Sequence, residues 1–163
     1  MEAIVRQAVS NDRNAFVDLT VKLSKFNRCN HAYESKNDDY NLVLNSVQGK
    51  AEETFSNRNK NTLILIAEIE GKPVGYALSR IFQQYETADN GTGLMGLFDE
   101  IYVDTMARGF GLGQKLLDET IKWMKGREID RVKLYAYTWN KNAKNMYEKN
   151  GFKGYAVSYE KFI

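Results

Sequence analysis

The sequence is poor in the residues that crosslink chains, bind metals or break helices. Its 163 residues include one cysteine, one histidine and one proline. Cys29 alone cannot form an intramolecular disulfide, and one cysteine with one histidine is a poor ligand supply for a zinc site. The sequence therefore disfavours a disulfide scaffold and predicts no metal site.

Excess charge and long apolar runs are also missing. Twenty-three Lys and Arg residues face 21 Asp and Glu residues, and the resulting charge of +2 is far from that of a typical DNA-binding domain. The longest apolar run is Leu63 to Ala67, whereas a membrane-spanning helix needs about 20 apolar residues. The first residues show no signal-peptide pattern. We expect a cytoplasmic protein whose partners are neither nucleic acid nor membrane.

Apolar side chains are abundant enough for one hydrophobic core. Hydrophobic residues make up 43% of the sequence and aromatic residues 12%, in a chain whose length suits one domain. At this length roughly two-thirds of the unfolded chain's surface is buried on folding. We therefore expect residues 1–163 to form a single domain.

The spacing of apolar residues predicts alternating strands and helices. Strands are expected at 4–9, 62–69, 74–82, 97–103, 131–137 and 155–162, and helices at 13–26, 42–55, 116–124 and 143–150. The order β-α-α-β-β-β-α-β-α-β starts with a meander and ends with a crossover that makes one strand pair parallel. The expected fold class is α/β with a mixed sheet.

A glycine-rich segment, Arg108-Gly109-Phe110-Gly111-Leu112-Gly113, lies between a predicted strand and a predicted helix. Free amides at a helix N-terminus bind anions, alternating glycines allow close backbone approach, and the arginine adds positive charge. A P-loop would need Gly-Lys before Ser or Thr, and a dinucleotide fingerprint would need two residues between its last glycines. Neither motif fits, so the segment predicts a phosphate site of another kind. A nucleotide-binding domain using these glycines stays an alternative.

The segment resembles the signature of the GNAT superfamily of acyl-CoA-dependent N-acyltransferases. That signature is Gln or Arg, two residues, Gly, one residue, and Gly or Ala, and Arg108, Gly111 and Gly113 match it. The family commonly has a strand ending in aliphatic-x-Val before this loop, and Ile101-Tyr102-Val103 stands in that place.

A second segment strengthens the resemblance. GNAT proteins commonly carry Asn, two residues, Ala, three residues, Tyr, and then Gly-Phe. Asn140, Ala143, Tyr147 and Gly151-Phe152 reproduce this motif at matching spacing. The two motifs together span about a third of the chain, from residue 97 to residue 152.

The resemblance implies an N-acetyltransferase whose central strands splay to admit acetyl-CoA. In such a protein the segment 108–113 grips the diphosphate, and main chain near Ile101 and Val103 pairs with the pantetheine arm. Asn140 would contact the pantetheine amides, and Tyr147 stands at the family's general acid position. A phenol with a pKa of about 10 stays protonated at neutral pH and can donate a proton to a departing thiolate.

Two adjacent carboxylates, Asp99 and Glu100, are candidates for the base that deprotonates the acceptor amine. Regular alternation places them on opposite faces, Asp99 with Ile101 and Glu100 with Tyr102. We prefer Glu100, because Ile101 belongs to the expected buried face. Some relatives carry a glutamate on the next strand, but here that strand reads Tyr135-Ala136-Tyr137.

The acceptor side is less well defined. Tyr135, Tyr137 and Trp139 fit either cover for a sheet, which we favour, or an acceptor wall, and His31 is interpreted as a surface residue. Acidic residues in the loops favour a small polycationic amine through Coulomb attraction, although solvated loop charge is the simpler interpretation. These residues are Glu34, Asp38, Asp39, Glu86 and Asp89.

The expected reaction is direct attack of a primary amine on acetyl-CoA, with Tyr147 as general acid. The acceptor is either a small molecule or a protein N-terminus or lysine. Proteins of this family commonly form homodimers, so the resemblance also implies a homodimer. The alternative is a non-catalytic acyl-CoA-binding sensor that has lost its acceptor chemistry.

Overall fold

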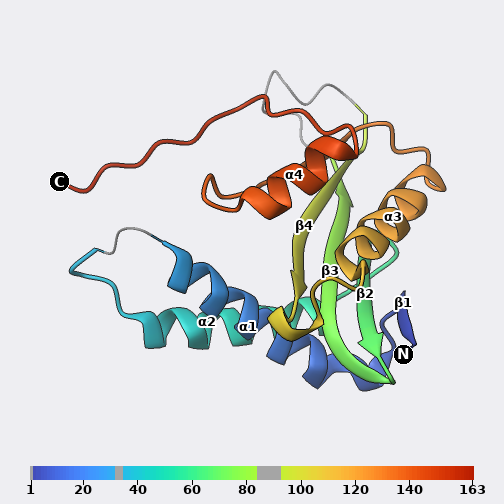
Figure 1. The fold of residues 1–163 in the computed structure, drawn as a ribbon, viewed down its shortest axis with the longest axis horizontal. Helices are drawn as coiled ribbons and strands as arrows, with labels where there is room; N and C mark the ends of the chain where they lie inside the picture. The colour runs from blue at the N-terminus through green and yellow to red at the C-terminus, as the bar shows by residue number, and fades with distance from the viewer. Residues whose placement is uncertain (1, 32–34, 84–92) are drawn as a thin grey trace.

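The computed structural model describes residues 2–31, 35–83 and 93–163 (Figure 1). The strands are β1 (Ala3–Gln7), β2 (Thr62–Ile69), β3 (Lys72–Phe82), β4 (Met95–Val103) and β5 (Val132–Leu134). The helices are α1 (Arg13–Asn30), α2 (Tyr40–Ser56), α3 (Leu112–Lys125) and α4 (Lys141–Lys149). None of the helices in these ranges is both long and apolar enough to cross a membrane.

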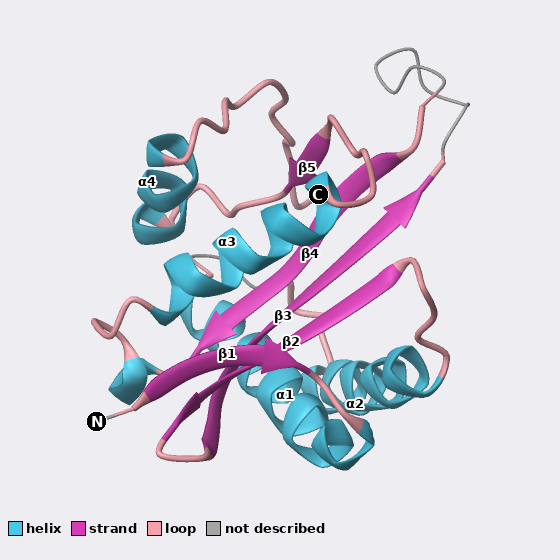
Figure 2. Ribbon diagram, turned by 90° about the vertical axis from the view of Figure 1, so that its right-hand side faces the viewer, coloured by secondary structure: helices cyan, strands magenta, loops and turns pink. Residues whose placement is uncertain are grey.

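The strands form one mixed sheet in the order β1-β2-β3-β4-β5. All neighbours are antiparallel except β4 and β5, which are parallel. The helices α1 and α2 lie against one face of the sheet, and α3 lies against the other (Figure 2). The predicted mixed α/β fold is therefore confirmed.

Each face of the sheet builds its own core, because alternate residues of β2 and β3 point in opposite directions. Ile64, Ile66, Tyr76 and Leu78 pack against α1 and α2 in one core. The other core contains α3 and part of α4. Six consecutive residues of β2 are buried, so this strand lies at the centre of the packing.

The predicted C-terminal strand at 155–162 is wrong. The structure has no strand after α4, and residues 152–163 run across the top of the molecule as irregular chain (Figure 1). Residues 155–162 alternate between apolar and polar side chains, but the apolar ones are not buried against a sheet. Val157 and Tyr159 are 71% and 90% exposed. The neighbouring strand β5 is also shorter than predicted and ends at Leu134.

A buried charge cluster fixes the N-terminal strand to the sheet. Arg6 on β1 donates two hydrogen bonds to Asp12, at 2.7 and 2.9 Å, and a third to Glu68 on β2. The side chains of Asp12 and Glu68 are only 8% and 9% exposed. The hydrogen bonds from Arg6 hold the pKa of Asp12 below its usual value.

We expect Arg6→Met to lower the free energy of unfolding by about 3 kcal/mol, because it leaves two buried carboxylates without their cation. For a chain of this size that corresponds to a fall in Tm of roughly 6–12 °C. Since the pKa of Asp12 is lowered in the folded state, its contribution is complete above about pH 4 and is lost as the pH falls further.

The difference in Tm between Arg6→Met and the natural protein should therefore shrink in acid. The matched control is Arg13→Met, which breaks an exposed ion pair with Glu52 at 3.5 Å and should change stability by under about 1 kcal/mol. Equal effects of the two variants would contradict a structural role for the buried cluster.

Candidate active site

The strand β4 and the edge strand β5 diverge at one side of the sheet. β4 and β5 pair only between Gly96–Phe98 and Val132–Leu134, after which β5 ends and β4 continues to Val103. Splayed strands were expected, and β4 and β5 splay in this way, although β5 lies at the edge of the described sheet. The edge of β4 beyond Phe98, which includes Ile101 and Val103, thus has no strand pairing on its β5 side within the described residues.

A β-bulge interrupts β4 where the strands begin to diverge. Leu78 pairs with Glu100 and Ser79 pairs with Phe98, so Asp99 is the extra residue. The bulge breaks the alternation that predicts opposite faces for the two carboxylates. Asp99 forms an ion pair with Arg80 at 3.5 Å, and Arg80 and Glu100 line the same small cavity.

Glu100 lies on the face of the sheet covered by α1 and α2. Its Oε2 accepts a hydrogen bond of 2.6 Å from the hydroxyl of the buried Tyr76. Burial raises the pKa of Glu100, the hydrogen bond from Tyr76 opposes this shift, and the charge of Asp99 adds to it. Such a carboxylate is a stronger base than an exposed glutamate.

The glycine-rich segment forms a bend that opens the N-terminus of α3. Gly109 and Gly111 have φ angles of +90° and +72°, which glycine adopts without steric penalty. Gly111 is the N-cap of α3 and supplies no side-chain cap. The first amides of α3 therefore lack intrahelical acceptors and are suited to an anion.

The Arg108 side chain lies beside the end of β4. Its Nε donates to the carbonyl of Val103 at 3.1 Å, and its guanidinium carbon lies 4.5 Å from the centre of the Phe26 ring. The positive charge is thus held between α1 and the glycine-rich segment.

Contacts between α3 and α4 bring the glycine-rich segment close to the second motif. A Cβ at Gly113 would lie 3.5 Å from Sδ of Met146. Gln114 and Asn150 exchange amide hydrogen bonds of 2.8 and 2.9 Å. Asn140 caps α4 by accepting a hydrogen bond from the amide of Ala143 at 3.2 Å.

Tyr147 lies on α4 and is only 6% exposed. Its ring packs edge-on against Phe98 of β4 and against Phe152. Burial raises the pKa of Tyr147 to about 12. The phenol therefore keeps its proton at neutral pH, and its ring lies near the point where β4 and β5 diverge.

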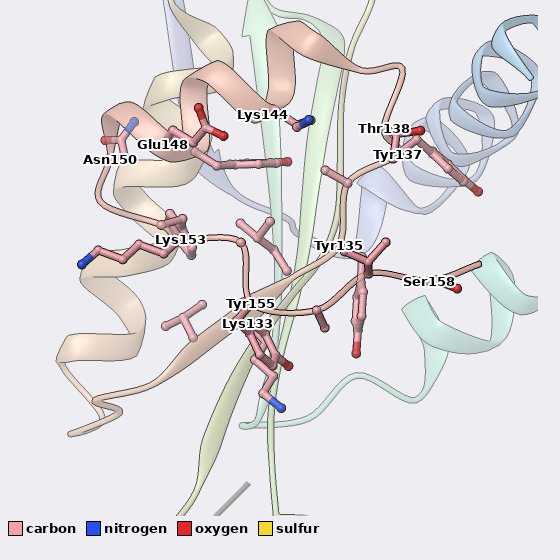
Figure 3. Close-up of a pocket in the computed structure, with 18 of the residues that line it drawn as sticks. Lys133, Tyr135, Tyr137, Thr138, Lys144, Glu148, Asn150, Lys153, Tyr155 and Ser158 are labelled. Atoms are coloured by element: carbon pink, nitrogen blue, oxygen red, sulfur yellow. The ribbon is translucent and has the colours of Figure 1, made fainter. Parts of the chain in front are cut away.

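Tyr147 also lines a large groove between α4, β5 and the chain that follows α4 (Figure 3). The groove has a volume of about 2060 Å³. Lys133 and Tyr155 lie together within it, with Nζ 5.3 Å from the ring centre. The residues 108–113 do not line this groove, although α3 connects the two regions.

The aromatic residues after β5 pack on the end of α1 rather than on the sheet. Tyr137 and Trp139 stack at 5.4 Å, and Trp139 packs against Phe26 at 5.8 Å. Trp139 Nε1 donates to Nδ1 of His31 at 3.3 Å, a contact that the sequence analysis missed. Tyr135 is 80% exposed and takes no part in this cluster.

The acidic loop residues have local structural partners. Asp38 forms an ion pair with Arg28 at 3.3 Å, and Asp39 caps α2 by accepting hydrogen bonds from the amides of Asn41 and Leu42. Glu34, Glu86 and Asp89 lie outside the described residues. The case for a polycationic acceptor is correspondingly weaker.

Comparison with known proteins identifies the family. The sequence model of the acetyltransferase (GNAT) family matches residues 27–152, which include both motifs. The chain belongs to the GNAT family. The GNAT fold also extends over nearly the whole chain, since a predicted acetyltransferase from Clostridium acetobutylicum, solved with acetyl-CoA, superposes with a TM-score of 0.71 at 21% identity over 99% of this chain and 96% of that one.

Other GNAT-like proteins act on different acceptors. An aminoglycoside acetyltransferase from an uncultured soil metagenomic sample, solved with sisomicin, has a TM-score of 0.65 and 18% identity over 99% of this chain and 96% of that one. A mycothiol acetyltransferase from Thermobispora bispora is 34% identical over 95 residues, which are 56% of this chain and 30% of that protein. The matches to three curated relatives span 20%, 30% and 37% of their lengths.

Proposed function

We propose that this GNAT protein transfers the acetyl group of acetyl-CoA to a primary amine of a small molecule. The observation that carries the proposal is the packing of α3 on α4, which places the open helix N-terminus after Gly111 near Tyr147. Membership of the acetyltransferase family supports it. The co-substrate is supported by the fold neighbour solved with acetyl-CoA.

The residues present fit the chemistry of coenzyme A. Amides at 109–113 would hold the diphosphate, and the edge of β4 at Ile101 and Val103, where Arg108 already donates to the Val103 carbonyl, would pair with pantetheine. Arg108 adds a positive charge close to that edge. Asn140 uses its side-chain oxygen to cap α4, which leaves its amide nitrogen for a pantetheine contact.

The reaction needs one base and one acid. Glu100 accepts a proton from the acceptor ammonium, directly or through water, and the amine nitrogen then attacks the thioester carbon. As the carbon–sulfur bond breaks, Tyr147 donates its proton to the departing sulfur, and the new amide nitrogen releases its second proton, which restores the Tyr147 phenol. Asp99 is the weaker candidate for the base, because Arg80 pairs with it.

The test is release of the coenzyme A thiol from acetyl-CoA in the presence of single amines and of peptides with free N-termini. Acetylation of at least one small amine is expected. Turnover restricted to peptides would replace the small acceptor with a protein N-terminus or lysine. Tight coenzyme A binding without turnover of any amine would instead support an acyl-CoA sensor.

The glycine-rich segment can be tested with a matched pair of glycines. Gly111 and Gly71 both have a φ of +72° and have no atom within 4 Å of an added Cβ, so alanine strains the backbone similarly at each. We expect Gly111→Ala to raise KM for acetyl-CoA about tenfold, because strain displaces amides that bind the diphosphate. Gly71→Ala, in the β2–β3 turn, should lose similar stability with no change in KM. Equal KM values in the two variants would exclude this segment from cofactor binding.

A further inference from the structure

A small cavity on the α1 and α2 side of the sheet has the charge pattern of an acceptor site. Its volume is about 280 Å³, which suits a molecule the size of an amino acid. The walls include apolar side chains from both helices and from β3, with Glu100 from β4. The lining residues are Phe16, Thr20, Val47, Lys50, Ala51, Glu53, Thr54, Leu78, Arg80 and Glu100.

The carboxylate of Glu100 is the feature of this cavity that selects an ammonium group. It forms no ion pair within the described residues, and its one hydrogen bond there comes from Tyr76. Burial disfavours this carboxylate, the charge of Arg80 offsets only part of that penalty, and a bound ammonium would offset more of it. Glu100 also follows the bulge at Asp99, close to the point where β4 and β5 diverge.

Two cationic side chains line the same cavity, which argues against an acceptor with several positive charges. Arg80 approaches Asp99 at 3.5 Å, longer than a good hydrogen bond, so its guanidinium donors are available for a second carboxylate. Lys50 on α2 forms no ion pair with any residue in the described ranges. Together they offer a site for an anionic group near the amine.

We propose that the acceptor is a small primary amine that also carries a carboxylate, bound with its ammonium at Glu100 and its carboxylate at Lys50 and Arg80. This inference rests on the proposed acetyl transfer and names the class of acceptor. Glu53 also lines the cavity, so its lining carries two carboxylates and two cations, and like Lys50 it is exposed.

The experiment compares amino acids with their decarboxylated amines and with linear polyamines at equal concentration. We expect kcat/KM to be at least about tenfold higher for an amino acid than for its decarboxylated counterpart, the effect of one charge-assisted contact. Lys50→Met and Arg80→Gln should each bring this ratio towards one. Lys72→Met, an exposed lysine at the start of β3, should leave the ratio unchanged.

Two results would overturn the proposal. These are a preference for polyamines or decarboxylated amines, and a ratio that survives Lys50→Met and Arg80→Gln in folded protein. A failure of the proposed function is distinguishable, because no small amine of any class would then be acetylated although acetyl-CoA still binds.

Discussion

Replacing Tyr147 with phenylalanine is expected to lower kcat about 100-fold, the usual size of a general acid's contribution. The substitution removes one hydroxyl and keeps the ring that packs against Phe98 and Phe152. Because the loss concerns the breaking of the carbon–sulfur bond, KM for acetyl-CoA should change little. The measurement is steady-state thiol release under saturating acetyl-CoA.

The control for Tyr147→Phe is Tyr102→Phe. Tyr102 is also buried, and burial together with its hydrogen bond to Asp104 raises its pKa to about 12, but its hydroxyl is held by Asp104 and it lines neither the groove nor the small cavity. We expect that variant to keep nearly full activity. If Tyr147→Phe were equally active, the proton for the sulfur would have to come from another group.

The raised pKa of Tyr147 also leads to a prediction about how kcat depends on pH. Since its pKa is raised to about 12, it stays protonated across the neutral range and should cause no decline in kcat below about pH 10. A decline near neutral pH that disappears in Tyr147→Phe would contradict this assignment.

Replacing Glu100 with glutamine is expected to lower kcat/KM about 100-fold by removing the base. In the natural protein kcat/KM should fall as the pH drops below the raised pKa of Glu100, because the protonated carboxyl cannot accept the amine's proton. The glutamine variant should lose this dependence. Rate measurements across the acidic range give both results.

Loss of activity in Glu100→Gln should come without loss of stability. A carboxyl whose pKa is raised by burial destabilises the folded state at pH values above that pKa, so a neutral glutamine should leave Tm equal or higher at neutral pH. The amide oxygen can still accept the hydrogen bond from Tyr76. Asp99→Asn serves as the comparison, and a larger loss of activity there would make Asp99 the base.

The sequence predicted the parts of the site that depend on local pattern. The glycine-rich segment was expected to lie between a strand and a helix, as it does, and helical spacing anticipated the helix that carries Tyr147. These features arise within a few residues of the chain, so single-sequence reasoning captures them. The mixed sheet followed from the order of the elements.

Features that depend on distant partners were not predictable. The bulge at Asp99 depends on how β3 and β4 align, and no residue type in β4 predicts it. The hydrogen bond between His31 and Trp139 joins residues 108 positions apart. The C-terminal alternation resembled a strand, but a strand also needs a neighbour long enough to pair with, and β5 has three residues.

The amide exchange between Gln114 and Asn150 has a consequence for how this sequence can vary over evolution. Each side chain donates one hydrogen bond to the other and accepts one from it, across 36 positions of sequence. Changing one alone removes both of these direct hydrogen bonds between the helix that opens at the glycines and the end of the helix of the tyrosine. The two positions should therefore covary, so that their replacements appear as compensating pairs.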